Sequence, residues 1–230
     1  MKNAETLLKN GLEALGLNDS RIYSLFCAYI KEIELFNPAY GLVGVTNSEE
    51  LIIKHILDSL APLGIISRLL ESLNCPTPAL QIADAGSGAG LPGIPLAIAM
   101  MNLPSGKPCN FSLIERMGRR AGFLCNTKAV LSLSNITVEE CELEKAAPGC
   151  FDLVTFRAFK PIEPKLLKSL FKTCSREGFI AAYKGKMEKI KEEMSALYTQ
   201  QKETIQWEAI PYSVPFLDEQ RHLLVIRRKN

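Results

Sequence analysis

The sequence predicts an α/β fold: a seven-stranded, mostly parallel sheet with an antiparallel C-terminal hairpin and an N-terminal helical extension. Three observations support this prediction. Apolar residues recur at helical spacing before residue 79, short apolar strands alternate with helices after it, and a polar link without a helix joins the last two strands. Such alternation is typical of a parallel sheet covered on both faces. We expect residues 1–78 to form the extension and residues 79–230 the core of one compact unit.

The individual elements follow from local patterns. Four helices are expected between residues 3 and 73, where Asp19-Ser20 and Asn47 supply N-cap chemistry for two of them. The predicted strands are Leu80–Ala85, Phe111–Glu115, Ile136–Glu139, Phe151–Phe156, Phe179–Tyr183, Trp207–Ile210 and Leu223–Ile226. The helices between them are predicted near residues 93–101, 117–132, 161–174 and 186–202. We expect the polar segment Leu217–Arg221 to link the two strands of the hairpin.

The composition is that of an ordinary folded chain. The 230 residues are 47% hydrophobic and 23% charged, which excludes collagenous, low-complexity and wholly disordered classes. The formal net charge is only +2, but residues 157–190 carry nine basic and three acidic side chains, whereas residues 1–60 carry five basic and eight acidic ones. Attraction to a polyanion must therefore come from where the charges lie and not from their sum.

The cysteines and the N-terminus indicate the compartment. The seven cysteines form no C-x-x-C pair and no cluster with histidine, so the sequence predicts neither a disulfide framework nor a metal site. The N-terminus lacks a long apolar segment, and no stretch reaches the roughly 18 apolar residues that span a bilayer. We expect a cytoplasmic protein that does not enter a membrane.

A glycine-rich loop follows the first predicted strand, and segment 84–95 reads D-A-G-S-G-A-G-L-P-G-I-P. Glycines let the backbone turn sharply and approach a ligand, and the N–H groups of the next helix face the same place. Glu115, 22 residues after Gly93, stands where a carboxylate that binds ribose hydroxyls belongs. The pattern indicates a nucleoside-binding loop. Its candidate cofactor-binding residues are Asp84, Gly86, Gly88, Gly90 and Glu115.

Two features favour S-adenosylmethionine over NAD as the cofactor. The glycines begin directly after the strand as G-x-G-x-G, and the chain ends in an antiparallel hairpin, as in Rossmann-like class I methyltransferases. An NAD enzyme also needs an acid or base for hydride transfer, and the sequence has only two histidines. One of them, His222, belongs to the pattern of the last strand, directly before Leu223, and is expected to make a structural hydrogen bond. An NAD-dependent oxidoreductase and a non-catalytic nucleoside-binding regulator remain the alternatives.

Several segments together resemble one family. The loop D-A-G-S-G-A-G-L-P-G-I-P-L at 84–96 is preceded by K-H-I-L-D-S-L at 54–60 and followed by F-R-A-F at 156–159 and Y-K-G at 183–185. In this order the segments resemble the RsmG family, also named glucose-inhibited division protein B, over about residues 36–190. Members of that family methylate N7 of a guanine in 16S ribosomal RNA. The resemblance implies the same activity here, with S-adenosyl-L-methionine as cofactor and 16S ribosomal RNA or the small ribosomal subunit as partner.

The resemblance also implies site residues. His55 and Asp58, at positions i and i+3 of one helix, are expected to brace the glycine loop from the extension. One segment departs from the family pattern, because Gly41 and Val43 stand where the family has Asn and Thr. The residues that take the family's cofactor-binding positions are Gly86, Leu91, Glu142, Leu143 and Arg157.

Guanine N7 as the target suits the side chains that the sequence offers. Its lone pair attacks the methyl group directly, so no base is needed and the protein acts mainly by positioning the reactants. The segment after the fourth strand lacks the Asp/Asn-Pro-Pro-aromatic motif of amine methylation, and neither Cys150 nor Cys174 stands in a Pro-Cys motif. The candidate catalytic residues are Arg157, a charge at the end of a buried strand, and Phe159, which could stack on the base.

Basic residues near the strand ends are candidates for RNA contact. Three arginines open the helix after the second strand, where the helix dipole favours acidic residues, and two lysines follow the fifth strand. The predicted RNA-binding residues are Arg116, Arg119, Arg120, Lys184 and Lys186. We expect the protein to work as a monomer.

Overall fold

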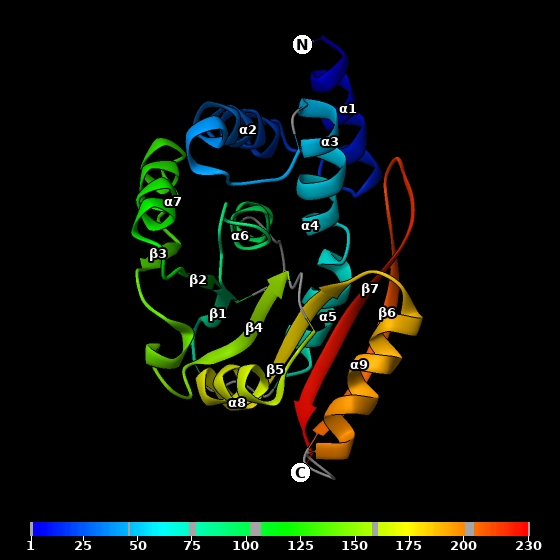
Figure 1. The fold of residues 1–230 in the computed structure, drawn as a ribbon. Coiled ribbons are helices and arrows are strands. Elements are labelled where there is room, and N and C mark those ends of the chain that lie inside the picture. Colours follow the sequence, from blue (N-terminus) through cyan, green and yellow to red (C-terminus); the bar gives the residue numbers. More distant parts are fainter. Residues whose placement is uncertain are drawn as a thin grey trace.

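The protein folds around a central sheet with helices on both faces (Figure 1). The computed structural model describes residues 2–45, 47–73, 77–101, 107–157, 161–200 and 205–229. The strand order is β3-β2-β1-β4-β5-β7-β6, in which β1 to β5 run parallel and β7 runs antiparallel to both of its neighbours. The predicted mostly parallel sheet with an antiparallel C-terminal hairpin is therefore confirmed. The strands are β1 Leu80–Ala85, β2 Cys109–Ile114, β3 Ile136–Glu139, β4 Phe151–Arg157, β5 Cys174–Lys184, β6 Ile205–Val214 and β7 Leu217–Arg228.

The C-terminal hairpin is longer and tighter than the sequence predicts. The prediction that Leu217–Arg221 is the link was wrong, because these residues belong to β7 and the turn is Pro215-Phe216. The physical reason is strand pairing: β6 and β7 pair as far as Val214 opposite Leu217 at the tip, with one shift of register between Tyr212 and Val214. Phe216 has a positive φ of 65° and is 55% exposed at this tip.

The predicted helices are present with small shifts of their ends. The described part of the extension contains four helical runs, the third of which passes from an α-helix through a π-helical segment back into an α-helix. The predicted caps are confirmed, since Asp19 accepts from Arg21 N at 2.6 Å and Asn47 accepts from Glu50 N at 2.8 Å. The helices are α1 Lys2–Ala14, α2 Ser20–Tyr40, α3 Ser48–Leu51, η1 Ile52–Leu57, α4 Asp58–Leu60, α5 Leu63–Glu71, α6 Gly93–Met100, α7 Gly118–Val130, η2 Leu143–Lys145, α8 Pro164–Thr173 and α9 Met187–Gln200.

Each face of the sheet has its own hydrophobic core, because successive strand residues point to opposite faces. On β1, Ile82 joins the core shared with the extension, α6 and α7, whereas Ala83 joins the core under α8 and α9. On β7, Val225 and Leu224 divide in the same way. The extension therefore contributes to the main core. Residue 78 remains a proposed boundary between extension and core.

Helix α2 reaches the glycine loop from the extension. The hydroxyl of Tyr29, a fully buried side chain, donates to the carbonyl oxygen of Ala89 at 2.6 Å. The same helix ends at Gly41, which has φ 57° and whose N–H donates to Asn37 O at 2.9 Å. Both Gly and Asn suit this left-handed position, which explains why Gly can stand where the family has Asn. The Val43 N–H donates to the Asn37 side chain at 2.9 Å, so a hydrogen bond of the backbone holds this segment.

We predict that Tyr29→Phe destabilises the protein by about 1–3 kcal/mol, because the buried Ala89 carbonyl loses its donor. The control is Tyr40→Phe on the same helix, since the Tyr40 hydroxyl makes no hydrogen bond within the described part of the chain. This control is expected to stay within about 0.5 kcal/mol of the wild type in urea unfolding. Equal losses in both variants would show that Tyr29 contributes nothing specific.

Candidate active site

The candidate residues gather at the carboxyl edge of the parallel strands. β1 and β4 are neighbours at the centre of the sheet, and the connections that leave them run to opposite sides. Ligands of open α/β sheets bind at this kind of switch point. Asp84 lies near the end of β1, Glu115 follows β2, Arg157 ends β4 and Lys184 ends β5. The topology therefore brings residues from four separate parts of the sequence to one edge.

The glycine loop is open where a ligand would pass. Gly86 and Gly88 have φ values of 72° and 58°, which favour glycine. A Cβ at Gly86 would meet nothing within 4 Å, and one at Gly88 would meet only the Gly86 carbonyl oxygen at 3.9 Å. Gly93 differs, because a Cβ there would lie 2.7 Å from Asp84 Oδ2. The first two glycines thus leave space beside the loop, whereas Gly93 permits close packing of α6 against β1.

Asp84 organises the loop from below. Its Oδ2 accepts from the Ser87 hydroxyl at 2.6 Å and from Gly93 N at 3.0 Å. Its Oδ1 is buried and has no hydrogen-bond partner among the described residues. Burial raises the pKa of Asp84 from 3.8 to about 6, against the lowering effect of these two hydrogen bonds and of Arg157. Oδ2 of Asp84 therefore orders the glycine loop, whereas Oδ1 remains available to accept a hydrogen bond from a ligand.

Glu115 connects the glycine loop to the segment after β2. Its side chain is buried, with Oε2 accepting from Gly88 N at 2.9 Å and Oε1 accepting from Met117 N at 2.9 Å. A carboxylate oxygen has two lone pairs, so each oxygen keeps one for a ligand hydroxyl. The structure places Glu115 against the loop, as its position in the sequence suggested.

A cavity of about 480 Å³ lies beside the ends of β2 and β3. Glu142 lines this cavity, whereas Leu143 begins η2 and packs against the core under α8 and α9. The sequence analysis missed the lining residues Met117, Glu140, Cys141 and Lys145. Their signal was position alone, since they lie in the segments that follow the carboxyl ends of the neighbouring parallel strands β2 and β3.

Arg157 is held by the extension. Its Nη2 donates to the Lys54 carbonyl at 3.1 Å and lies 3.4 Å from Asp58 Oδ2, while Nη1 is buried without a partner among the described residues. Asp58 Oδ1 also accepts from the Tyr212 hydroxyl at 3.2 Å and lies 3.3 Å from Arg221 Nε. The sequence analysis did not single out Tyr212 or Arg221.

The sequence analysis expected His55 and Asp58 to brace the glycine loop, but the described contacts of Asp58 are to other residues. Asp58 contacts Arg157, Arg221 and Tyr212, and the direct hydrogen bond to the loop comes from Tyr29. Burial lowers the pKa of His55 from 6.5 to about 4, with further lowering by the charges of Arg157 and Lys54. His55 is therefore neutral at physiological pH.

The three predicted RNA-binding arginines lie in different surroundings. Arg116 is exposed and lines the cavity beside β2 and β3. Arg119 lies over the Tyr40 ring, with its Cζ 5.7 Å from the ring centroid, and Arg120 Nη2 donates to the Gly41 carbonyl at 3.3 Å. Arg119 and Arg120 therefore also attach α7 to the end of α2.

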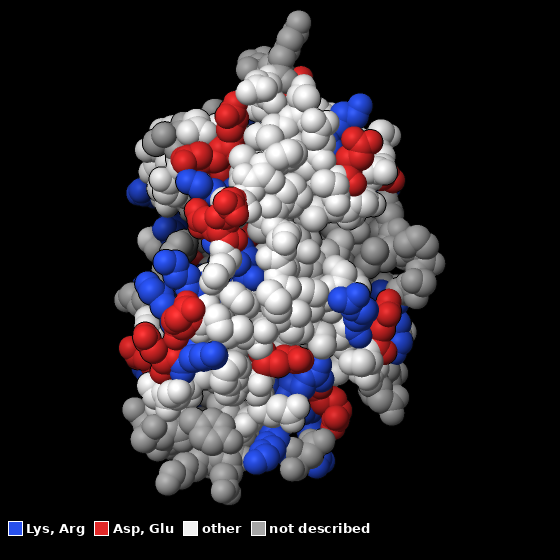
Figure 2. Space-filling view, turned by 90° about the vertical axis from the view of Figure 1, so that its right-hand side faces the viewer, with Lys and Arg blue, Asp and Glu red and all other residues white. Residues whose placement is uncertain are grey.

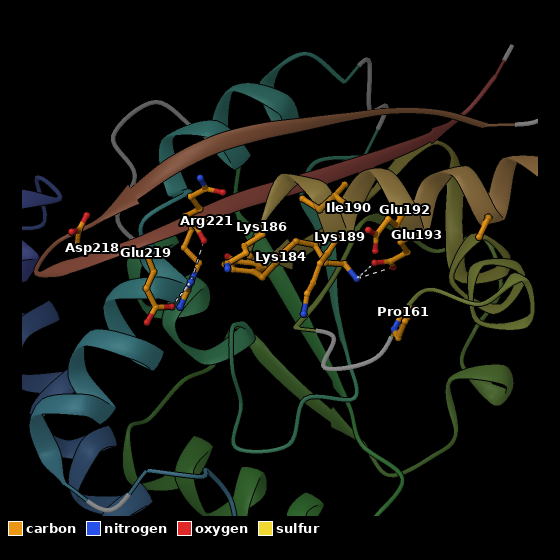
Figure 3. Close-up of a pocket in the computed structure, with 14 residues that line it drawn as sticks. Pro161, Lys184, Lys186, Lys189, Ile190, Glu192, Glu193, Asp218, Glu219 and Arg221 are labelled. Carbon is orange, nitrogen blue, oxygen red and sulfur yellow. Dashed lines mark hydrogen bonds and ion pairs between the residues drawn. The ribbon is translucent and has the colours of Figure 1, made fainter.

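The two predicted RNA-binding lysines differ in availability. The Lys184 ammonium is 2.8 and 2.9 Å from the two carboxylate oxygens of Glu193, and both side chains are buried. Lys186 is exposed and lines a large cavity beside α9 (Figure 3). Lys186 is thus the better placed of the two for phosphate contact. The predicted base-stacking residue Phe159 lies outside the described residues.

Other sequence expectations concern structural roles. His222 Nδ1 donates to the Gly185 carbonyl at 2.6 Å, which confirms its structural hydrogen bond. Over the described part of the chain, no cluster of ligating side chains could hold a metal ion, and no helix is long and apolar enough to cross a membrane. The cysteines within the described ranges, all except Cys75, are free thiols.

The fold and the site together define a class of protein. An open glycine loop after β1, acids at the ends of β1 and β2, and an antiparallel β7 beside β5 form the arrangement of a class I methyltransferase. A SAM-dependent methyltransferase from Aquifex aeolicus has a similar fold, with a TM-score of 0.54 at 13% identity. The similarity covers 86% of this chain and 96% of that chain.

The sequence relatives show the family. The family model of rRNA small subunit methyltransferase G, GidB, matches residues 22–224. The ribosomal RNA small subunit methyltransferase G of Treponema denticola is 36% identical, over 96% of this chain and 94% of the relative. The protein of the same name from Treponema pallidum is 38% identical, over 91% and 89%. The chain belongs to the rRNA small subunit methyltransferase G family, as its motifs predicted, and the two alternatives are not favoured.

We predict that Asp84→Asn changes the pH dependence of stability in the ligand-free protein. Because the folded state raises the pKa of Asp84 to about 6, it holds this proton more tightly than the unfolded chain. The protonated Asp84 therefore stabilises the folded state fully below about pH 4, and this stabilisation is lost as the pH rises through about 6. The loss in free energy of unfolding is roughly 3 kcal/mol. The amide of Asp84→Asn does not titrate, so the variant does not undergo this loss. Relative to the wild type, the variant should therefore gain stability between about pH 4.5 and about pH 7.5.

Urea unfolding at both pH values measures this gain. The lowered pKa of His55 gives a contribution of opposite sign in the same pH range, but it is common to both proteins and cancels in their difference. A difference between variant and wild type that is the same at both pH values would contradict a proton held on Asp84.

Proposed function

We propose that the chain transfers the methyl group of S-adenosylmethionine to N7 of a guanine in 16S ribosomal RNA. The observation that carries the proposal is membership of the methyltransferase family over residues 22–224, with the open glycine loop at the matching strand end. We also propose that the protein acts as a monomer. A ribosomal substrate supports a cytoplasmic place of action.

The residues around the loop fit S-adenosylmethionine. The open backbone at Gly86 and Gly88 admits a ligand, Glu115 keeps lone pairs for the ribose hydroxyls, and the cavity beside Glu142 offers room for the adenine. The unpartnered Asp84 Oδ1 suits an ammonium group. The proposed cofactor contacts also include Gly90, Leu91, Leu143 and Arg157, whose Nη1 suits the methionine carboxylate.

N7 methylation requires positioning and no proton transfer. S-adenosylmethionine, when bound, would supply a methyl group on a positively charged sulfur, and its transfer to the N7 lone pair would break the sulfur–methyl bond and leave S-adenosylhomocysteine. The chain must hold the base in line with this methyl group, and such positioning can lower a barrier by roughly 7–11 kcal/mol. Arg157, fixed by Asp58 and the Lys54 carbonyl, is proposed to border both reactants. Phe159 is proposed to stack on the base.

The cysteines argue against methylation of a pyrimidine carbon, which needs a thiolate nucleophile. Cys174 begins β5, at the edge of the sheet opposite the candidate site, and burial raises its pKa from 9.0 to about 12. Cys141 lines the cavity beside β3, and burial also raises its pKa. Neither thiol is prepared to attack. N7 of guanine, which needs neither a thiolate nor a base, suits this site better.

We predict that Gly88→Ala weakens binding of S-adenosylhomocysteine by about tenfold or more, because the new Cβ enters the space beside the loop. The matched control is Gly149→Ala, since Gly149 has φ 66° and an equally open surrounding but lies far from the loop. Both variants should lose a similar stability of about 1–2 kcal/mol from backbone strain. Calorimetry that finds wild-type affinity in folded Gly88→Ala would place the cofactor elsewhere.

The proposed reaction is tested with 16S ribosomal RNA and small ribosomal subunits from cells that lack the gene. Wild-type protein and labelled S-adenosylmethionine should yield N7-methylguanosine on nucleoside mass spectrometry, and Gly88→Ala should yield much less at limiting cofactor. Label on a different base or atom, or none on either substrate, would overturn the proposal. Comparing the two substrates shows whether the assembled subunit is needed.

A further inference from the structure

A small polar cavity adjoins Arg157 on the side away from the glycine loop. Its volume is about 200 Å³. Its walls come from α4 and the carboxyl ends of β4 and β5, together with the two strands of the C-terminal hairpin. In the strand order, the hairpin and β5 lie beyond β4, whereas the glycine loop follows β1. The residues that line the cavity are Asp58, Arg157, Tyr183, Lys184, Gly185, Tyr212 and Arg221.

The charges around this cavity do not cancel. Asp58 is the single carboxylate between two guanidinium groups, those of Arg157 at 3.4 Å and Arg221 at 3.3 Å. Lys184 adds no excess charge because its ammonium is paired with Glu193. The charged lining residues are Asp58, Arg157, Lys184 and Arg221, whose formal charges, one negative and three positive, sum to +2. Glu193, outside the cavity, offsets Lys184 and leaves an excess of one positive charge, which the exposed Glu219 beside Arg221 offsets only in part. The place is largely buried, since the two arginine side chains are only 16% and 18% exposed.

Arg221 has capacity for a further acceptor. Its Nε faces Asp58 and its Nη1 donates to Glu219 at 2.9 Å and to the Gln220 carbonyl at 3.1 Å. No described residue accepts a hydrogen bond from its Nη2. The Glu219 side chain is 56% exposed, so water screens that ion pair and leaves the guanidinium incompletely neutralised. An arginine fixed on one side and open on the other is suited to bind an oxyanion.

The size of the cavity limits the ligand. A bound water takes about 30 Å³, so this volume admits a phosphate group with a few waters and is below the roughly 300–1,000 Å³ of sites for whole small molecules. A cavity of about 910 Å³ shares four lining residues with it and continues between α9 and β7 (Figure 3). Lys186 and Lys189 line this larger cavity and are exposed.

We propose that the small cavity binds a phosphate of the RNA strand beside the target guanine, with Arg221 as its main ligand. This inference rests on the proposed function and names a substrate contact of the same site. Arg157 adds positive charge from the cofactor side. The strand then continues into the larger cavity, past Lys186 and Lys189.

The test compares Arg221→Gln with wild type in binding of a 16S ribosomal RNA fragment, binding of S-adenosylhomocysteine and steady-state methylation. We expect the Kd and KM for RNA to rise about tenfold or more, as for loss of a charge-assisted hydrogen bond. The slope of log affinity against log salt should shrink by about 0.7, the value for one single-strand phosphate contact. Affinity for S-adenosylhomocysteine should stay within about twofold of wild type.

The matched control is Arg176→Gln, because Arg176 is an exposed arginine near the opposite end of β5. It removes the same charge and should leave both affinities unchanged. Arg221→Lys keeps the charge beside Asp58 and serves if Arg221→Gln is unstable. It should retain the wild-type salt slope with an RNA affinity that falls only a few-fold, since one ammonium replaces a bidentate guanidinium.

Three outcomes would overturn the inference. RNA affinity and salt slope unchanged in Arg221→Gln would mean that no phosphate occupies the cavity. A loss of S-adenosylhomocysteine affinity with RNA binding intact would assign the cavity to the cofactor carboxylate. A salt slope reduced equally in Arg221→Lys would exclude a charge contact. By contrast, a wild-type protein that binds RNA through Arg221 but methylates no guanine N7 would refute the proposed function and leave the phosphate site standing.

Discussion

The buried carboxylate of Asp58 holds together the elements on which the candidate active site depends. It contacts Arg157 at the end of β4, Arg221 on β7 and Tyr212 on β6, residues that lie about a hundred or more positions later in the sequence. A buried carboxylate without partners is costly, and so is a buried guanidinium, which is why these groups stabilise one another only in this arrangement. The extension, the centre of the sheet and the hairpin are joined at the site itself.

Two further carboxylates shape the cofactor half of the site. Asp84 accepts from Ser87 and Gly93, and Glu115 accepts from the backbone of Gly88 and Met117. These bonds order the glycine loop before any ligand arrives, while the Tyr29 hydroxyl from α2 supports the loop from the other side. Ordering in advance lowers the entropy cost of binding. The acids thus serve the fold and the ligand at the same time.

Basic and acidic side chains are mixed on the surface of this protein, so its charge varies from place to place. Figure 2 shows a face with a central strip that lacks charged side chains and with basic and acidic residues mixed along its margins. Within the basic stretch of residues 157–190, some lysines have partners and others are exposed. Lys184 is paired with Glu193, and Lys172 donates to the Glu144 carbonyl, whereas Lys186 and Lys189 stay exposed beside the large cavity. A near-neutral chain can therefore still present exposed lysines beside the cavity where RNA is proposed to bind.

The sequence by itself determined the local features of this protein. Apolar periodicity placed the strands and helices, the caps at Asp19 and Asn47 began two helices, and the glycine loop with Glu115 indicated a nucleoside site. Where the boundaries of predicted helices and strands shifted, the element type was right, whereas Leu217–Arg221, predicted as a link, belongs to β7. β5 starts at Cys174 and not at Phe179, because Cys174 pairs with Phe151 of β4 across the sheet.

Only the tertiary structure decided which side chains share the site. Three contacts depend on strand register and helix packing: Asp58 meets Arg221, Glu193 neutralises Lys184, and the partly buried Leu143 packs against the edge of the core under α8 and α9. The physical reason is the range of the forces involved: propensity and turn chemistry act over a few residues, whereas each of these contacts joins segments that only the folded sheet brings together.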